Sequence, residues 1–234
     1  MRSSPTRSSQ TISQSNATFM SRVYFWMMLG LVISGVVAYS IASSPELMAS
    51  IYSNKFIWIG LIVMQLAAVV ALSALINKIN ALTTTLLYIA YAALSGATFS
   101  VLLMVFTTQS ITQVFFITAF AFTGLSAFAY FTKRDLGPIG SFCMIGLFGL
   151  IGFILVTMLF PSLLTNAVSM TINTLGILIF AGLTAYDTQR IKNLNPVHQS
   201  SEIAQKAAIS GALMLYLDFI NLFINLLQLI GDRR

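Results

Sequence analysis

The sequence predicts an all-α integral membrane protein with seven transmembrane helices. Hydrophobic residues make up 57% of the 234 residues and charged residues only 8%, whereas an ordinary soluble domain has about 25% charged residues. The mean hydropathy is +0.88. Seven apolar segments follow one another, each close to the roughly 20 residues that a helix needs to cross a bilayer. We therefore expect one membrane domain over residues 21–234 and no second folded unit.

The predicted elements begin with a polar tail. Residues 1–20 are rich in Ser, Thr, Gln and Arg, a composition that predicts disorder. The apolar segments then lie at 24–42, 56–76, 83–106, 112–131, 139–160, 168–191 and 211–230. Only an uncharged turn around residues 107–111 separates the third from the fourth. The first segment could instead be a signal peptide, but its run of about 19 apolar residues exceeds the usual 7–15 and favours a span.

Lys and Arg predict the orientation, because cytoplasmic loops carry an excess of them. If the N-terminus is cytoplasmic, that side holds Arg2, Arg7, Arg22, Lys78, Lys133, Arg134, Arg190, Lys192 and Lys206. Lys55 is then the only basic residue in a loop on the opposite side. The C-terminal pair Arg233 and Arg234 conflicts with this pattern, since seven spans place it outside. Either the last segment re-enters the membrane or the earlier loops dominate, and we favour the second.

Charge and cysteine content exclude several classes of protein. The net charge is +6, but the basic residues are scattered with no basic face, so we expect no nucleic-acid partner. Cys143 is the single cysteine and lies in an apolar run, which excludes an intramolecular disulfide and a cysteine metal cluster. We expect Cys143 to be a small buried residue and His198, in a polar loop, to be solvated. We predict no resident cofactor.

Two aspartates lie within segments that otherwise read as membrane-spanning helix, Asp187 in FAGLTAYDTQ and Asp218 in LMLYLDFINLF. A carboxylate at membrane depth costs roughly 2.5–3.5 kcal/mol on insertion scales. Such a residue is therefore rarely present for packing alone. An intramembrane acid indicates an ion site, a proton relay or a catalytic group.

Helical spacing places these acids on polar faces. In the seventh segment Asp218, Asn221, Asn225 and Gln228 recur at helical spacing, and in the sixth Thr184 and Asp187 share a face with Asn173 and Phe180. Lipid would not tolerate such a row, so we expect these residues to line the bundle interior or a hydrated pathway. If the seventh helix begins near Gly211 and the connection is 193–210, the two acids lie level to within about one turn.

Two carboxylates that meet in a medium of low dielectric do not both ionise easily, so the pair can share one proton and sense pH. When both are ionised they repel each other and become transient oxygen ligands for Ca²⁺. A basic residue at the same edge of the membrane could hold the closed state. Lys78 and Arg190 are the candidates for this latch, with Lys192 a further possibility.

The residues resemble a known family. GLTAYDTQRIK at 182–192 and GALMLYLDFINLFINLLQLIG at 211–231 are similar to the two motifs of the Bax inhibitor-1 family of transmembrane proteins. YAALSGATFS at 91–100 and YFTKRDLG at 130–137 also resemble family motifs, and the similarity is closest to the short bacterial inner-membrane members.

The resemblance implies a fold of six helices around a central seventh and a pH-sensitive calcium leak gated by Asp187 and Asp218. It also implies a basic partner near the end of the second helix, for which Lys78 is the nearest match. Some relatives carry a further acid within the second helix, where this chain has only Gln65 as a strongly polar residue.

Two other functions compete with this interpretation. Intramembrane aspartyl proteases also place two Asp on adjacent helices, and Tyr186-Asp187 fits their first motif, but Asp218 does not follow their Gly-x-Gly pattern. We therefore expect no enzymatic activity. The second alternative is a regulatory protein that binds another membrane protein, such as a quality-control protease, through the polar tail.

Overall fold

The prediction of seven membrane-spanning helices is confirmed. A computed structural model describes residues 5–76, 78–194 and 200–234, and seven of its helices are long and apolar enough to cross a membrane. The chain forms two compact units. The first comprises Met1–Val105 and Ile191–Tyr216, and the second comprises Phe106–Arg190 and Leu217–Arg234. The predicted placement of six helices around the seventh stays a prediction.

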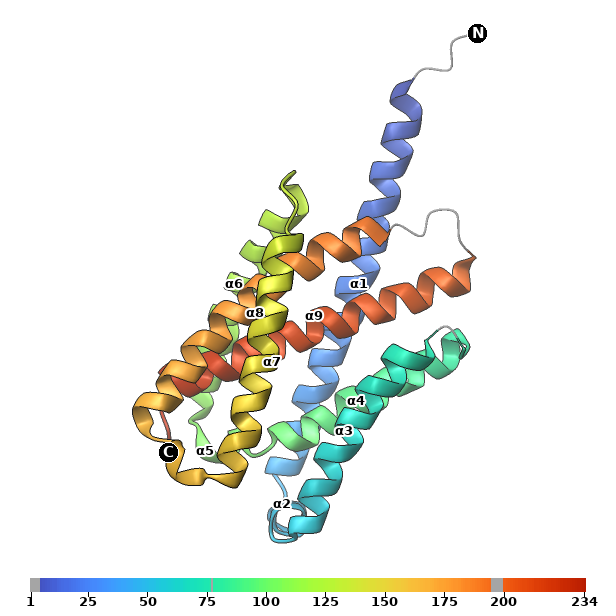
Figure 1. Cartoon of the computed structure of the whole chain (residues 1–234). Helices are drawn as coiled ribbons and strands as arrows, with labels where there is room; N and C mark the ends of the chain where they lie inside the picture. The colour runs from blue at the N-terminus through green and yellow to red at the C-terminus, as the bar shows by residue number, and fades with distance from the viewer. Residues whose placement is uncertain (1–4, 77, 195–199) are drawn as a thin grey trace. The chain divides into compact units, whose positions relative to one another are not determined.

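The first unit is built on two long helices that pack closely, α1 (Pro5–Ala42) and α4 (Ala81–Phe99). Gly96 of α4 allows this approach, because a Cβ there would meet the backbone of Ser34 on α1. Helix α3 (Lys55–Leu75) lies beside α4 (Figure 1). The short helices α2 (Pro45–Tyr52) and α5 (Leu102–Val105) complete this part of the chain.

Helix α1 begins at Pro5 and so includes residues for which the sequence predicts disorder. Once an apolar helix has formed, extending it costs less than starting a new one, because each added residue gains a hydrogen bond without a new nucleus. The proline stands at the first helical position, where its missing N–H costs nothing. The division of the chain at residue 20 stays a prediction.

The second unit contains α6 (Thr108–Phe131), α7 (Gly137–Leu159), the short 3₁₀ helix η1 (Pro161–Leu163), and most of α8 (Asn166–Leu194). It also contains residues 217–230 of α9 (Ser201–Ile230). Thr107 caps α6, since its hydroxyl accepts a hydrogen bond from the Ser110 amide at 3.2 Å. That cap separates α6 from the preceding span at the uncharged turn that the sequence predicts.

Helix α9 begins at Ser201, ten residues before the predicted start at Gly211. Residues 201–210 are too polar to be detected by hydropathy, but they are helical, and their side chains bind within the first unit. Glu202 accepts from the Ala81 amide at 3.3 Å, and Lys206 donates to the Ile79 carbonyl at 3.1 Å. The connection between α8 and α9 is correspondingly shorter than predicted, and His198 lies outside the described residues.

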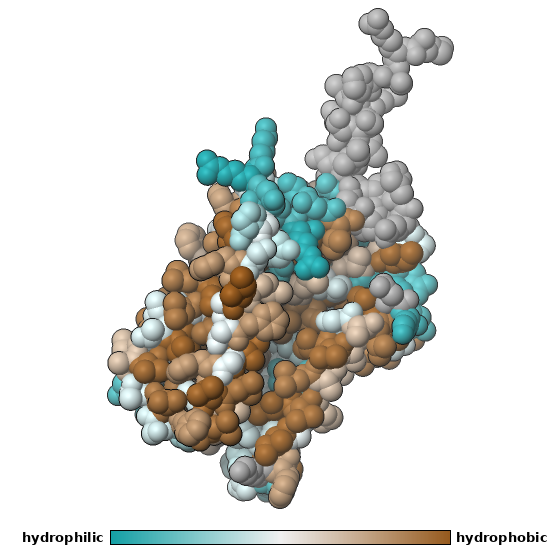
Figure 2. Space-filling view, in the orientation of Figure 1, coloured by the Kyte–Doolittle hydropathy of each residue, from teal (hydrophilic) through white to brown (hydrophobic). Residues whose placement is uncertain are grey.

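Apolar side chains cover the flanks of the helices, as expected for contact with lipid. On the second unit Phe120 of α6 is 85% exposed and Phe142 of α7 is 75% exposed. Figure 2 shows hydrophobic residues over these flanks and polar residues gathered where α6 ends. The exposed charged residues at that end are Lys133, Arg134 and Asp135. This pattern marks the connection between α6 and α7 as an aqueous edge.

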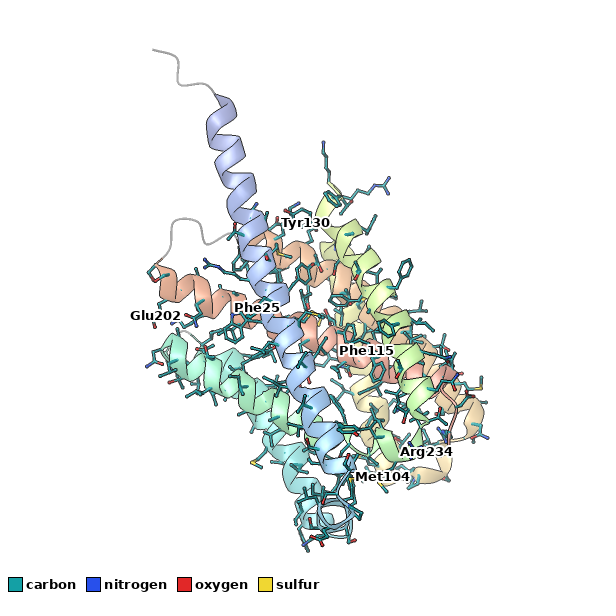
Figure 3. The ribbon with its side chains drawn as sticks, turned by 180° about the vertical axis from the view of Figure 1, so that it is seen from behind. Phe25, Met104, Phe115, Tyr130, Glu202 and Arg234 are labelled. Atoms are coloured by element: carbon teal, nitrogen blue, oxygen red, sulfur yellow. The ribbon has the colours of Figure 1, made fainter. Side chains whose placement is uncertain are left out.

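The C-terminal arm, residues 231–234, is tied to the start of α6. Phe106 and Arg233 form an antiparallel bridge, and the Thr107 amide donates to the Asp232 carbonyl at 3.1 Å. The Arg234 guanidinium donates to the Thr108 hydroxyl at 3.3 Å (Figure 3). Helix α9 is one uninterrupted helix of 30 residues that ends beside the start of α6, which favours a full seventh crossing over a re-entrant last segment.

This arrangement predicts that Arg234 and the connection at residues 132–136 lie on opposite sides of the membrane. A compartment-sensitive reporter fused after Arg234 should give the opposite signal to the same reporter inserted after Arg134. A fusion after Ala42 serves as the control for the Arg234 side, because one span precedes Ala42 and seven precede Arg234, so both positions lie on the side opposite the N-terminus. Equal signals after Arg134 and Arg234 would contradict the seven-span topology.

Candidate functional site

The second unit brings the two intramembrane aspartates together. Asp187 lies on α8 and Asp218 on α9, close enough for their carboxyl groups to interact electrostatically. Asp218 is only 4% exposed, whereas Asp187 is partly buried. Asp218 lies twelve residues before the end of α9 at Ile230, about 18 Å along the helix axis. The pair therefore lies inside the span, nearer to the end at which α6 and α7 are connected.

A hydrogen bond between two carboxyl groups requires a proton, because an ionised carboxylate is only an acceptor. Among the described residues, Asp218 Oδ2 is buried without any hydrogen-bond partner. No neighbouring amide or hydroxyl of these residues satisfies that oxygen. We therefore expect Asp187 and Asp218 to share a proton, whose loss would leave a buried, uncompensated charge.

Side chains of α8 fix the position of Asp187 against the connection after α6. Gln189 accepts from the Leu136 amide at 2.9 Å and donates to the Arg134 carbonyl at 2.8 Å. The hydroxyl of Thr188, a fully buried residue, lies 3.2 Å from the Ser126 hydroxyl of α6. These contacts flank Asp187 in the sequence and hold its turn of α8 at the aqueous edge.

Close packing against α7 fixes the opposite flank of α8. A Cβ at Gly140 of α7 would meet the Tyr186 ring, and a Cβ at Gly182 of α8 would meet the Cys143 sulfur. Cys143 is buried, as the sequence predicts, and is close enough to Asp218 to interact with it electrostatically. The recurring glycines Gly149 and Gly152 of α7, in contrast, face open space.

Aromatic packing holds α9 beside Asp218. The Phe219 ring lies 5.5 Å from the rings of Phe115 and Phe122 on α6, measured between centroids (Figure 3). Such edge-to-face pairs contribute about 0.5–1.5 kcal/mol beyond their buried area. The backbone that carries Asp218 is therefore held by rigid rings rather than by flexible side chains.

The two predicted latch residues, Arg190 and Lys78, lie in different surroundings. Arg190 is exposed one turn after Asp187 and is close enough to interact with it electrostatically. Lys78 is exposed and belongs to the first unit. Arg190 is thus the candidate partner within the unit that holds the pair, and a latch through Lys78 stays a prediction.

The predicted pathway residues differ in burial. Thr184 is fully buried, and its hydroxyl donates to the Phe180 carbonyl at 2.7 Å within α8. Asn221 and Asn225 are partly buried, and Gln228 is exposed near the end of α9. The row of polar residues on α9 therefore runs from a buried carboxyl group to an exposed amide.

Sequence reasoning missed three residues that position the pair. These are Gln189, Ser126 and Tyr186, whose contacts are described above. The sequence analysis names Tyr186 only as part of a protease-like dipeptide and gives it no role in positioning the pair. A glutamine two residues after an intramembrane acid was a usable signal, because an amide can bond both an N–H and a carbonyl.

The pair could hold a hard cation only transiently. Ca²⁺ takes six to eight oxygen ligands, and two carboxylates supply at most four. In the part of the chain that the structure describes, no group of three or more His, Cys, Asp or Glu side chains gathers to hold a metal ion.

Comparison with known proteins gives consistent matches over almost the whole chain. Residues 16–234 match the family described as inhibitor of apoptosis-promoting Bax1. The chain is 41% identical over 219 residues to the inner membrane protein YbhL of Escherichia coli strain K12, covering 93% of this chain and 92% of that protein. It is 41% identical over 217 residues to an uncharacterized protein of Borreliella burgdorferi, covering 92% of each. It is 30% identical over 217 residues to an uncharacterized membrane protein of Streptococcus pyogenes serotype M3, covering 91% of this chain and 92% of that protein.

The contact between Gly182 and Cys143 predicts a specific pattern of stability. Gly182→Ala should destabilise the protein by about 1–3 kcal/mol, because the added methyl group overpacks the sulfur. Adding Cys143→Ala should recover most of that loss by removing the sulfur. The melting temperature in detergent measures both effects. Gly149→Ala, where the methyl group enters open space, is the matched control. Additive losses in the double variant would show that the two residues do not meet.

The shared proton predicts a pH-dependent stability with a defined sign. The contact stabilises the protein while the proton is held, and that contribution disappears as the pH rises and the proton leaves. The melting temperature should therefore fall between about pH 6 and about pH 8, by the equivalent of about 1–3 kcal/mol for a buried group left without its partner.

Asp218→Asn should flatten this dependence, because an amide donates to Asp187 at every pH. Asp135→Asn changes an exposed carboxyl group outside the spans and should keep the wild-type slope. A slope that survives Asp218→Asn would place the responsible group elsewhere.

Proposed function

The chain belongs to the Bax inhibitor-1 family and is a multi-pass membrane protein, and we propose that it is a pH-sensitive calcium leak channel gated by Asp187 and Asp218. The observation that carries this proposal is the contact between the two carboxyl groups inside the membrane span, with one oxygen of Asp218 buried and without a partner. A carboxyl group at this depth is costly and is not needed for packing.

The gate works by the change in charge that follows loss of the shared proton. With one proton, α8 and α9 are joined by a hydrogen bond between the carboxyl groups. Without it, two like charges repel across a medium of low dielectric, and the pair becomes a set of oxygen ligands for a divalent cation. Arg190 is placed to interact with the ionised Asp187 and so to bias this equilibrium.

The incomplete ligand set favours passage over storage of calcium. The two carboxylates supply fewer oxygens than Ca²⁺ requires, so water must complete its shell. Weak coordination is what conduction needs, because an ion must leave a site as readily as it enters. The polar face of α9 beyond Asp218, with Asn221 and Asn225, offers further oxygens along the same helix.

We propose that the protein lies in the cell inner membrane with its N-terminus in the cytoplasm, and that it is not an enzyme. The named Escherichia coli relative is an inner membrane protein, and the excess of Lys and Arg in the loops on the N-terminal side supports this orientation. A proteolytic role for the two aspartates has the support of the Tyr186-Asp187 dipeptide alone.

Calcium flux in liposomes tests the proposal. Purified protein in dye-loaded vesicles should pass Ca²⁺ at a rate that changes between about pH 6 and about pH 8, since the shared proton is lost in a range set by the pair. Asp187→Asn and Asp218→Asn should each reduce the ratio of the two rates to about one, because neither variant can form a proton-sharing carboxyl pair.

Asp135→Asn serves as the matched control, because it makes the same change at an exposed carboxyl group. Absent flux, or flux whose pH ratio survives both substitutions, would refute the gate. The regulatory alternative, in which the N-terminal segment binds another membrane protein, would then become the leading hypothesis. Its test is recovery of that protein from membranes with the full chain but not with residues 1–20 deleted.

A further inference from the structure

The connection between α6 and α7 carries two positive charges that the rest of the described chain leaves unpaired. Lys133 and Arg134 are exposed, and neither side chain makes a hydrogen bond or an ion pair with a residue that the structure describes. The carboxyl group of the next residue, Asp135, accepts a hydrogen bond from the Gly137 amide at 2.9 Å. That acid is therefore directed to the start of α7, and the two cations extend from the connection.

The backbone of this connection is fixed, so the cations are held in a defined place. Gln189 of α8 donates to the Arg134 carbonyl at 2.8 Å and accepts from the Leu136 amide at 2.9 Å. The Thr132 hydroxyl accepts from the Arg134 amide at 3.3 Å. Both backbone polar groups of Arg134 are thus bonded while its guanidinium is not. A connection that is already ordered loses less conformational entropy when a ligand binds to its side chains.

Lipid-facing side chains lead up to the connection along both helices. Phe128 and Phe131 near the end of α6 are 56% and 78% exposed, and Phe142 in the first turns of α7 is 75% exposed. Figure 2 shows the polar residues gathered where this hydrophobic flank ends. Because the acyl chains of a lipid cover such a flank, its headgroup lies at the level of the connection.

The chemistry of the exposed cations suits the phosphate of an anionic lipid. A guanidinium presents a planar fork of N–H donors that matches two phosphate oxygens, and an ammonium adds a compact charge. Arg190 is also exposed and directly follows Gln189, which bonds to the Arg134 carbonyl, so a third positive charge lies at this edge. A zwitterionic headgroup has no net charge with which to offset this excess, which favours anionic lipids.

We propose that Lys133 and Arg134 form a docking surface for the phosphate of an anionic phospholipid whose acyl chains lie along the lipid-facing side of α6 and α7. Gln189 is a positioning residue for this surface, because it holds the connection against α8 two residues after Asp187. A bound lipid therefore stabilises the contact between the connection and α8, whether or not the protein passes Ca²⁺.

Lipid binding to the purified full chain tests the docking surface. Native mass spectrometry from a neutral detergent counts bound phosphatidylglycerol molecules and gives the affinity of the tightest one. Lys133→Gln combined with Arg134→Gln should weaken that affinity about thirtyfold, because each Lys or Arg near an anionic lipid surface contributes about fivefold. Phosphatidylcholine should bind the wild type and this double variant equally, since it carries no net charge.

Matched variants separate a built surface from a general effect of charge. Arg22→Gln combined with Arg234→Gln removes two exposed positive charges elsewhere and should keep the affinity within about threefold of wild type. Gln189→Ala keeps every charge but releases the connection, and should weaken binding. Lys133→Arg should retain it. Size-exclusion chromatography confirms that each variant is folded.

Three results would overturn the docking surface. The first is equal affinity of the wild type and the Lys133 and Arg134 double variant for phosphatidylglycerol. The second is an equal loss in the Arg22 and Arg234 double variant, which would show that only net charge matters. The third is a melting temperature that inorganic phosphate raises in the wild type and not in the Lys133 and Arg134 double variant, because the occupant would then be a soluble anion. None of these measurements depends on calcium flux.

Discussion

The closeness of two carboxyl groups, those of Asp187 and Asp218, is the constraint around which the second unit is built. Two ionised carboxylates offer only acceptors, and one oxygen of Asp218 has no other partner among the described residues. The surrounding contacts do not neutralise this charge. They fix the geometry instead. Gln189 of α8 bonds to the connection after α6, and the aromatic rings of α6 hold Phe219. In the proposed gate, a rigid frame around this pair would convert a change in protonation into a force between α8 and α9 rather than into a rearrangement of side chains.

Several hydroxyl groups in the membrane helices of this chain are satisfied locally. The hydroxyls of Thr118 and Thr184 donate to carbonyls one turn earlier in their own helices, at 2.7 Å in each case. Such bonds remove a donor without requiring a neighbour, which is why hydroxyl residues are common in spans that serve only packing. A carboxylate has no comparable local solution, because the helix backbone offers it only carbonyl oxygens. The contrast separates Asp218 from the many other polar residues at membrane depth.

The sequence predicts the spans well, because hydropathy accumulates over about 20 residues and tolerates errors at the ends. The start of α9 shows the limit: residues 201–210 are polar, and contacts of Glu202 and Lys206 with residues 79–81 hold them in place. Helical spacing also predicts that Asp187 and Asp218 share suitable faces. It cannot predict that Gly176 faces Asn225, since that depends on how α8 crosses α9. Nor does it predict the role of Gln189, whose two partners lie more than fifty residues earlier in the chain.

Among the described residues each unit buries one side-chain oxygen without a hydrogen-bond partner, Asn16 Oδ1 in the first and Asp218 Oδ2 in the second, and only the second is a carboxyl oxygen. In the first unit the Tyr216 hydroxyl lies 2.7 Å from that of Ser34, which donates to the Ala92 carbonyl. Gln65 donates to Ser95 at 3.0 Å and accepts from Thr98 at 3.2 Å, so both ends of its amide are used. A network whose donors and acceptors bind one another stabilises helix packing and has little attraction left for an ion. In the second unit the amide donors of Asn221 and Asn225 are used by their own helix while their oxygens remain acceptors, next to a carboxyl pair that lacks donors. A buried carboxyl pair with few donors around it is compensated most directly by a proton or a metal cation, and this is the physical basis of the proposed calcium leak.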